Sequence, residues 1–421
     1  MFLHERLVAV GSRGISVRRL GGSRAGEMRI TRFLRNDAVS LEEMQAHAMA
    51  RTCARSVGRH VLAIQDTTTV RADADGHSIT LHPVIAVDAL EGSLLGLVSA
   101  QFLIREGGKR AKHQTVKFAD KESRRWLDGA QAAGALSGAG AACVTVVADR
   151  EGDIYEDFAL RPEGTEVVIR AGQDRLLSDG THLFACLADR PEAGRITVEL
   201  PAAPGRKARK AIIALRFREI AIACPQNRKS TKEFETLPPL VQLTFVDARE
   251  VDPPPGVPDI TWRLLTSHRV TDLADARRIV GFYRRRWIIE ELFRTLKTKG
   301  FDIERLRLAE GPLQKLVLAS LIAAVTVLQL VHERDGSAKR PVEDAFDADD
   351  IPALESVCKS LEGNTLRQKN PHPQGSLAYA AWVLARLGGW TGYYGKPGPI
   401  VMLNGLVQFQ AIKHGWDLRL L

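Results

Sequence analysis

Two short apolar runs, each followed by an aspartate, constrain the fold of this chain more than any other feature. Residues 61–64 lead to Asp66, and residues 143–147 lead to Asp149. Short apolar runs of this kind are typical of buried strands, and open α/β sheets bind ligands at the carboxyl ends of their strands. The pattern therefore predicts an α/β protein with two carboxylates at strand ends. Taken alone, each aspartate could instead have a local role, Asp66 as a turn cap and Asp149 as an ion-pair partner of Arg150.

A third carboxylate lies in residues 271–300, which have the pattern of one long helix between a Thr271 cap and a Gly300 stop. At roughly 100° per residue, a group of polar side chains falls in a stripe about 60° wide. They are Tyr283, Arg286, Glu290 and Lys297. The positions expected to be buried are Ile279, Phe282, Ile289, Leu292, Phe293 and Leu296. Such a stripe is a solvated face with ion pairs, unless the strand-end aspartates lie beside it and make it part of a site.

Composition excludes several classes of protein. The chain has 421 residues, of which 45% are hydrophobic and 26% charged, as is typical of a soluble globular protein of two or three domains. The longest apolar run, at residues 316–331, is expected to be a core helix, and the N-terminus is not expected to be a signal peptide. The five cysteines form no C-x-x-C pair, which argues against a zinc site or a disulfide framework and suits a reducing cytoplasm.

The charge is moderately basic. A formal net charge of +9 is compatible with a polyanionic partner. Basic residues cluster in three loop-like segments, at 107–113, 205–210 and 227–232. These clusters either face a polyanion or are ordinary solubilising surface.

The order of the other elements predicts a mixed sheet of the ribonuclease H type. A helix at 39–55 precedes the first aspartate, and two strand-like segments follow it, at 80–89 and 93–104. A helix at 120–136 and a strand at 165–170 flank the second aspartate. From about residue 180 to 265, alternating segments between Pro, Gly and Lys-rich turns predict an antiparallel β insertion. We therefore expect an α/β, ribonuclease H-like core interrupted by this insertion, with a helical C-terminal region.

Three motifs resemble the signature blocks of a known family. They are AIQDTTTV around Asp66, ADREGDIYE around Asp149, and Y-x-x-R-W-x-I-E-x-x-x-x-x-x-K around Glu290. In order and spacing they are similar to the blocks of the DDE transposases of bacterial insertion sequences. The closest resemblance is to the cut-and-paste group with a Tyr-Arg-Glu-Lys signature, the insertion sequence four family. The similarity extends to RFLRND at 32–37, DKESRRWL at 120–127 and TWRLLTS before the helix, and covers most of residues 32–310.

The resemblance implies a role for each motif residue. Asp66, Asp149 and Glu290 would be the catalytic triad, binding two Mg²⁺ ions, for which Mn²⁺ would substitute. Phosphates near the scissile bond would be gripped by Tyr283, Arg286 and Lys297. Trp262 would stack a flipped base, its alternative being a buried strand tryptophan. Arg150 and Arg170, with Asp153, would orient DNA or brace the triad.

The resemblance also implies a reaction and partners. Water would nick one strand, the freed 3′ hydroxyl would form a hairpin with the other strand, and the reopened end would join target DNA. The partners would be double-stranded DNA with inverted-repeat ends, target DNA, and a second copy of the chain in a synaptic dimer. The protein would act in the bacterial cytoplasm, at the nucleoid, without a membrane.

The N-terminal region departs from the family pattern. Only about 31 residues precede the RFLRND block, and they are rich in Gly and Arg without clear helical periodicity. We therefore weigh two rivals to a competent transposase: a truncated regulator that binds DNA or dimerises, and a structure-selective nuclease. The expected divisions are a shortened DNA-binding remnant at 1–55, core at 56–180, β-rich insertion at 181–265, core with the catalytic helix at 266–310, and a helical dimerisation region at 311–421.

Overall fold

The computed structural model describes most of the chain in two compact units. The described residues are 3, 6–8, 15–106, 121–200, 207–225, 237–298, 300–393 and 395–419. Unit 1 comprises Met1–Val57, Thr67–Gly108 and Ile288–Leu421, and unit 2 comprises Gly58–Asp66 and Lys109–Trp287. The basic clusters predicted at 107–113 and 227–232 lie outside the described residues, as does part of the cluster at 205–210.

Unit 2 is built on a mixed sheet whose central strands are parallel. The strand order is β1-β5-β6-β10-β9-β8-β7, parallel from β1 to β6 and antiparallel from β6 to β7. The expected strands that end before Asp66 and Asp149 are both confirmed. The bounds are β1 His60–Gln65, β5 Cys143–Ala148, β6 Thr165–Arg170, β7 Gly194–Leu200, β8 Arg209–Ala223, β9 Leu240–Val251 and β10 Thr261–Thr266.

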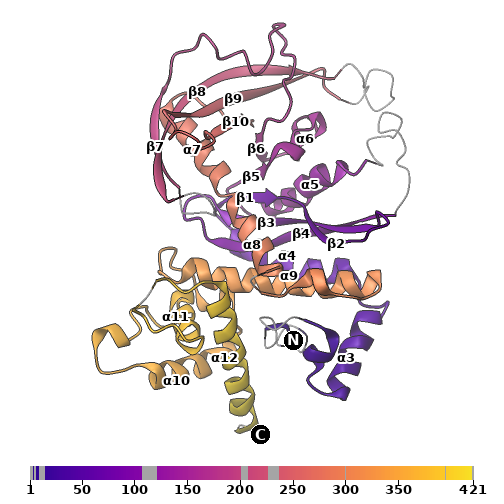
Figure 1. Cartoon of the computed structure of the whole chain (residues 1–421), viewed down its shortest axis with the longest axis vertical. Helices are drawn as coiled ribbons and strands as arrows, with labels where there is room; N and C mark the ends of the chain where they lie inside the picture. Colours follow the sequence, from indigo (N-terminus) through magenta and orange to yellow (C-terminus); the bar gives the residue numbers. More distant parts are fainter. Residues whose placement is uncertain are drawn as a thin grey trace. The chain divides into compact units, whose positions relative to one another are not determined.

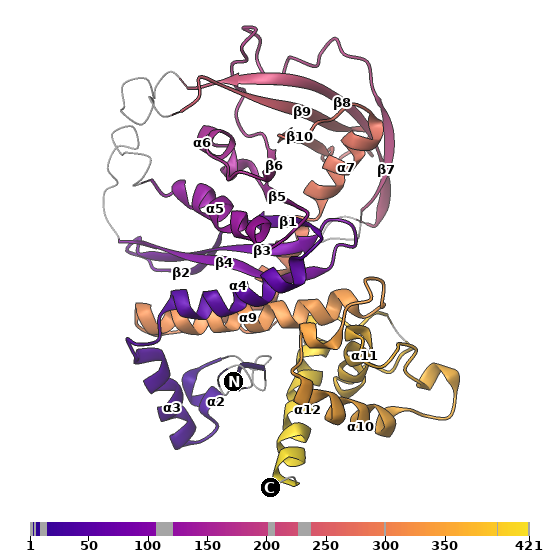
Figure 2. The same ribbon diagram turned by 180° about the vertical axis from the view of Figure 1, so that it is seen from behind.

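Helices cover both faces of the parallel strands. Helix α7 (Leu273–Arg284) lies on one face, and α5 (Arg124–Gly138) with the short α6 (Tyr155–Ala159) lies on the other (Figures 1 and 2). Strands β1 and β5 are accordingly buried along almost their whole length, on both faces. Continuous apolar runs are typical of parallel strands in this position, which is why the sequence pattern identified them.

Unit 1 combines an antiparallel hairpin with long helices. Strands β3 (Ser78–Asp88) and β4 (Leu94–Arg105) pair through a turn in which Gly92 has a φ of 78°, and β2 (Thr68–Ala72) pairs with β3. Helices α4 (Leu41–Ser56) and α9 (Glu310–Glu333) pack on β4 (Figure 1).

Helix α9 alone, among the residues that the structure describes, is long and apolar enough to cross a membrane. Because 83% of its most apolar window is buried inside the protein, it is the core helix that the sequence predicts. The C-terminal helices α10 (Ile351–Leu361), α11 (Leu377–Leu387) and α12 (Pro399–Arg419) complete this unit.

The N-terminal residues are more ordered than the sequence pattern indicates. They form helices α2 (Val17–Gly21) and α3 (Arg24–Arg35), capped by the side chains of Ser16 and Ser23. A Cβ on Gly26 would lie only 2.1 Å from the backbone oxygen of Gly21. The glycines therefore permit a close helix crossing, and the absence of a clear apolar period in the sequence was misleading.

The expected single helix at 271–300 is wrong in its continuity. Helix α7 ends at Arg284, and α8 (Trp287–Leu296) begins after two turn residues. Arg285 and Arg286 donate their backbone N–H groups to the carbonyls three residues earlier, as in a 3₁₀ turn. These hydrogen bonds replace the α-helical ones to the carbonyl four residues earlier, so the α-helix ends here. The cap is the side chain of Asp272, rather than Thr271. The predicted apolar positions are all buried, as expected.

Candidate active site

Asp66 and Asp149 follow two neighbouring parallel strands in the same register. Ile64 of β1 lies opposite Val147 of β5. Both aspartates lie just past the ends of their strands, and continuing the same register by two residues would bring Asp66 opposite Asp149, with neighbouring strands about 4.8 Å apart. Residues opposite each other in a parallel pair point to the same face, so this register predicts both carboxylates on one side of the carboxyl edge.

Arg286 supplies the positive charge at this edge. Its Nη1 donates to Oδ2 of Asp66 at 2.6 Å, and the two side chains are only 13% and 16% exposed. A charge-assisted hydrogen bond between groups this buried is strong and fixes the orientation of both. Arg286, which lies in the turn between α7 and α8, is therefore also the residue that binds Asp66.

Asp149 has a local structural role as well as its place at the edge. Its Oδ1 accepts from the backbone N–H of Glu151 at 2.8 Å, which caps the short 3₁₀ helix Arg150–Gly152. Arg150 is exposed, and among the described residues it forms no ion pair with Asp149. The local alternative for Asp149 is thus a helix cap, which leaves its other oxygen, Oδ2, outside that hydrogen bond.

Arg170 continues the same row of strand ends. Ala148 lies opposite Ile169, so the next position of the β5–β6 register pairs Asp149 with Arg170. The Arg170 guanidinium donates to the carbonyl of Thr261 at 3.0 Å. This contact ties β6 to the start of β10. The predicted roles of Arg170, orienting DNA or bracing the triad, stay predictions.

A buried clamp, centred on Asp153, holds the loops behind the edge. Asp153 accepts from the backbone N–H groups of Gly172 and Gln173, and its Oδ1 pairs with Arg175 at 2.6 Å. Both side chains are almost fully buried, at 0% and 6% exposure. Because this clamp joins the loop after β5 to the loop after β6, it positions Asp149. No sequence motif pointed to Arg175.

Trp262 and Tyr283 lie together, and Trp262 is at the start of β10, next to Thr261, which Arg170 contacts. Their ring centroids are 6.4 Å apart in an edge-on arrangement, and Tyr283 is 5% exposed. Trp262 is half-buried, so its exposure does not distinguish a base-stacking tryptophan from a buried strand tryptophan. The phosphate contact of Tyr283 and the base stacking of Trp262 stay predictions.

Glu290 and Lys297 belong to α8 and the turn that follows it. Glu290 is half-buried in the first turn of α8, four residues after Arg286 in the chain. Lys297 pairs with Glu304 at 2.8 Å, so part of the predicted stripe is an ion-paired surface. The convergence of Glu290 with the two aspartates stays a prediction.

Trp287 is a further candidate residue of the site. It is 57% exposed and follows Arg286 directly in the chain. A helical wheel could have found it, because at 100° per residue it falls opposite the apolar positions of α8.

The donor set at the edge suits a hard cation. Carboxylate oxygens are the ligands that Mg²⁺ prefers. Within the described ranges, no group of three or more His, Cys, Asp or Glu side chains is arranged to hold a metal ion. The charge of Arg286 offsets that of Asp66, so a cation entering this edge would compete with Arg286 for the carboxylate.

Comparison with known families agrees with the site. The model of the transposase DDE domain family matches residues 109–327, just over half of the chain. The matched range contains Asp149 and Glu290, whereas Asp66 lies before it and is joined to it by the pairing of β1 with β5. Such enzymes act on DNA and generally use divalent metal ions. The chain belongs to the transposase DDE domain family.

Proposed function

We propose that this transposase is a cut-and-paste enzyme of the bacterial insertion sequence four group. The observation that carries the proposal is the arrangement at the carboxyl edge of β1 and β5. There Asp66 and Asp149 share a register position, and Arg286 of the Tyr-Arg-Glu-Lys signature binds the first of them. A signature residue touching a strand-end aspartate is expected of a catalytic site and has no role in a merely solvated helix face.

In this proposal Asp66, Asp149 and Glu290 form the catalytic triad. Two bound Mg²⁺ ions would activate the attacking hydroxyl and neutralise the leaving oxygen in successive in-line displacements. Three carboxylates supply oxygen ligands and leave room for water and phosphate oxygens. The planar guanidinium of Arg286 fits a phosphate as well as it fits Asp66, so it can hold the aspartate before DNA binds and a phosphate afterwards.

The reaction course is proposed from the same family. The enzyme would nick one strand at each inverted-repeat end, form and open a hairpin, and join the end to target DNA as a homodimer. Residues 181–265 would be the β-rich insertion, which the antiparallel strands β7 to β9 support. Exposed Trp287 and half-buried Trp262 are the aromatic surfaces available for unpaired bases.

The N-terminal helices support a DNA-binding role for residues 1–55. Helix α3 buries Gly26, Ile30 and Leu34 and turns its arginines to solvent. The exposed arginines of α2 and α3 are Arg18, Arg19, Arg24, Arg29, Arg32 and Arg35. Contacts from such a surface to phosphates would weaken steeply with salt.

The test is a Mg²⁺-dependent cleavage assay on candidate inverted-repeat ends with Glu290→Gln. We expect the variant to bind the end DNA as the wild type does, and to lose nicking, hairpin and strand-transfer products. Glu343→Gln, an exposed carboxylate of the same unit, is the matched control and should retain all of them. Cleavage by Glu290→Gln would refute the triad. Hydrolysis without strand transfer in the wild type would identify a nuclease instead, and binding without cleavage would identify a regulator.

A further inference from the structure

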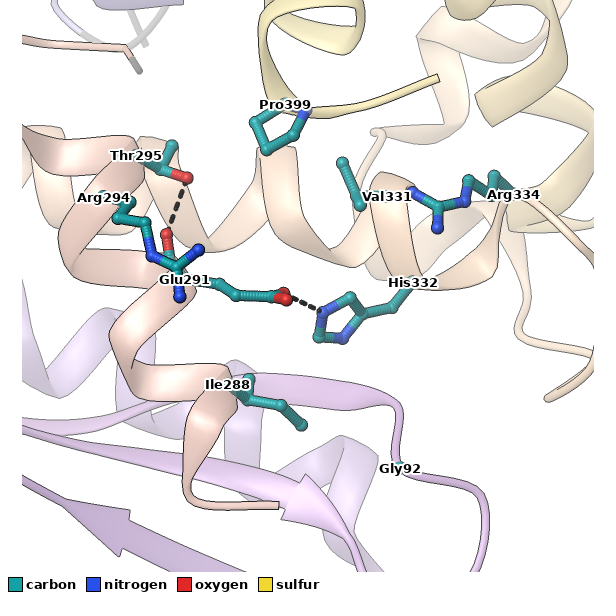
Figure 3. Close-up of a pocket in the computed structure, with 9 residues that line it drawn as sticks. All are labelled: Gly92, Ile288, Glu291, Arg294, Thr295, Val331, His332, Arg334 and Pro399. Atoms are coloured by element: carbon teal, nitrogen blue, oxygen red, sulfur yellow. Dashed lines mark hydrogen bonds and ion pairs between the residues drawn. The ribbon is translucent and has the colours of Figure 1, made fainter. Parts of the chain in front are cut away.

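Unit 1 contains a polar cavity beside α8 that the proposed chemistry does not use. Its volume is about 470 Å³, within the range of pockets that hold small organic ligands. Helix α8 supplies Glu291 and Arg294, and the end of α9 supplies His332 with Arg334 following it. Figure 3 shows Arg294 and Arg334 on opposite sides of the hydrogen-bonded Glu291–His332 pair.

The cavity carries cationic groups whose hydrogen-bonding capacity is not filled. Arg294 is exposed and, within the described residues, makes no hydrogen bond or ion pair. Arg334 donates from Nη1 to the carbonyl of Pro397 at 2.9 Å, but its buried Nε has no partner among the described residues. Guanidinium N–H groups left without a partner at one cavity favour an oxyanion with several acceptor oxygens.

Glu291 is the one carboxylate on the wall, and its charge is partly offset. It pairs with Nε2 of His332 at 3.3 Å, and this hydrogen bond lowers the pKa of Glu291. With two guanidiniums against one carboxylate, the wall is net positive. Ile288, Val331 and Pro399 add an apolar part to the wall, which inorganic phosphate alone would not use.

We propose that this cavity binds a single nucleotide, with the phosphate between Arg294 and Arg334 and the base against the apolar wall. Guanidiniums grip phosphate oxygens through paired N–H groups, which fits two arginines on opposite sides. The nucleotide could be free in solution or be the end of a DNA strand, because both present the same phosphate ester. The inference does not depend on the catalytic triad.

The test is equilibrium binding of dAMP to the full chain in EDTA, so that no cleavage is needed. We expect saturable binding that Arg294→Gln and Arg334→Gln each weaken about tenfold or more, as lost charged hydrogen bonds should. Arg305→Gln is the matched control, since that side chain is 86% exposed and its ion pair within the described residues is a local one, with Asp302. Glu291→Gln removes the opposing charge and should tighten binding, a gain that misfolding cannot produce.

The competing outcomes are distinct. Equal affinity for inorganic phosphate and dAMP would overturn the assignment to a nucleotide. Unchanged binding in both arginine variants, or weaker binding by Glu291→Gln, would overturn the site itself. A 5′-phosphorylated oligonucleotide identifies the source of the phosphate. If the arginine variants lose more affinity for the oligonucleotide than for dAMP, the ligand is a DNA strand end. If they lose affinity for dAMP alone, the ligand is the free nucleotide.

Discussion

Replacing Arg286 by Gln tests whether the strand-end carboxylates form one electrostatic unit. In the folded protein Arg286 and Asp66 are paired at 2.6 Å with little exposure. Removing one partner of such a pair leaves an uncompensated charge, which costs about 3–5 kcal/mol when the pair is buried. Asp149 follows the neighbouring parallel strand, so a second carboxylate at the same edge adds to the repulsion that Asp66 would meet. We therefore expect Arg286→Gln to lower the free energy of unfolding by about 3 kcal/mol in EDTA.

The measurement is urea unfolding of wild type and variants, in EDTA and in Mg²⁺. Mg²⁺ should stabilise Arg286→Gln more than the wild type, because in the wild type the ion must displace Arg286 from Asp66. The double variant Asp66→Asn with Arg286→Gln should recover most of the loss, because both charges of the pair are then removed together. Arg284→Gln is the control, because that guanidinium is exposed and its hydrogen bond within the described residues is a long one, to the carbonyl of Glu199 at 3.5 Å. An unchanged midpoint for Arg286→Gln in EDTA would refute the reasoning.

Two further predictions concern buried groups of unit 2. Burial lowers the pKa of His268 to about 4, so between pH 6.5 and 4 the unfolded chain binds a proton that the folded protein does not. Stability should therefore fall as the pH falls through this window, by up to about 1.4 kcal/mol per pH unit. His268→Gln should flatten that slope in unfolding measured across the window, and an unaltered slope would contradict the assignment. Arg175→Met should destabilise the protein by about 3–5 kcal/mol, because it removes the ion-pair partner of the buried Asp153 carboxylate. Arg175→Lys keeps the charge but not the forked geometry, so its urea midpoint should lie between those of Arg175→Met and the wild type.

Local periodicity determined much of the fold. The strands before Asp66 and Asp149 were identifiable because a parallel strand covered on both faces must be a continuous apolar run. The apolar positions of α7 and α8, and the core helix α9, followed from the same reasoning. The signature motifs identified the family because their residue types and spacing can be read without any structure.

Tertiary structure decided what depends on contacts between distant segments. Arg286 lies 220 residues from Asp66 in the chain, and no local pattern states that the helix must break for the two to meet. The crossing of α2 and α3 depends on Gly21 and Gly26 approaching within a methyl group's width, where the sequence shows only glycines without a period.

Sequence by itself therefore determined the family, the strands and the candidate residues of this protein. It did not determine the partner of each charge, because a partner is selected by strand register and by the burial that packing imposes. The Asp153–Arg175 clamp and the cavity between Arg294 and Arg334 are both of this kind. Their groups become neighbours only when the sheet and the helices are assembled.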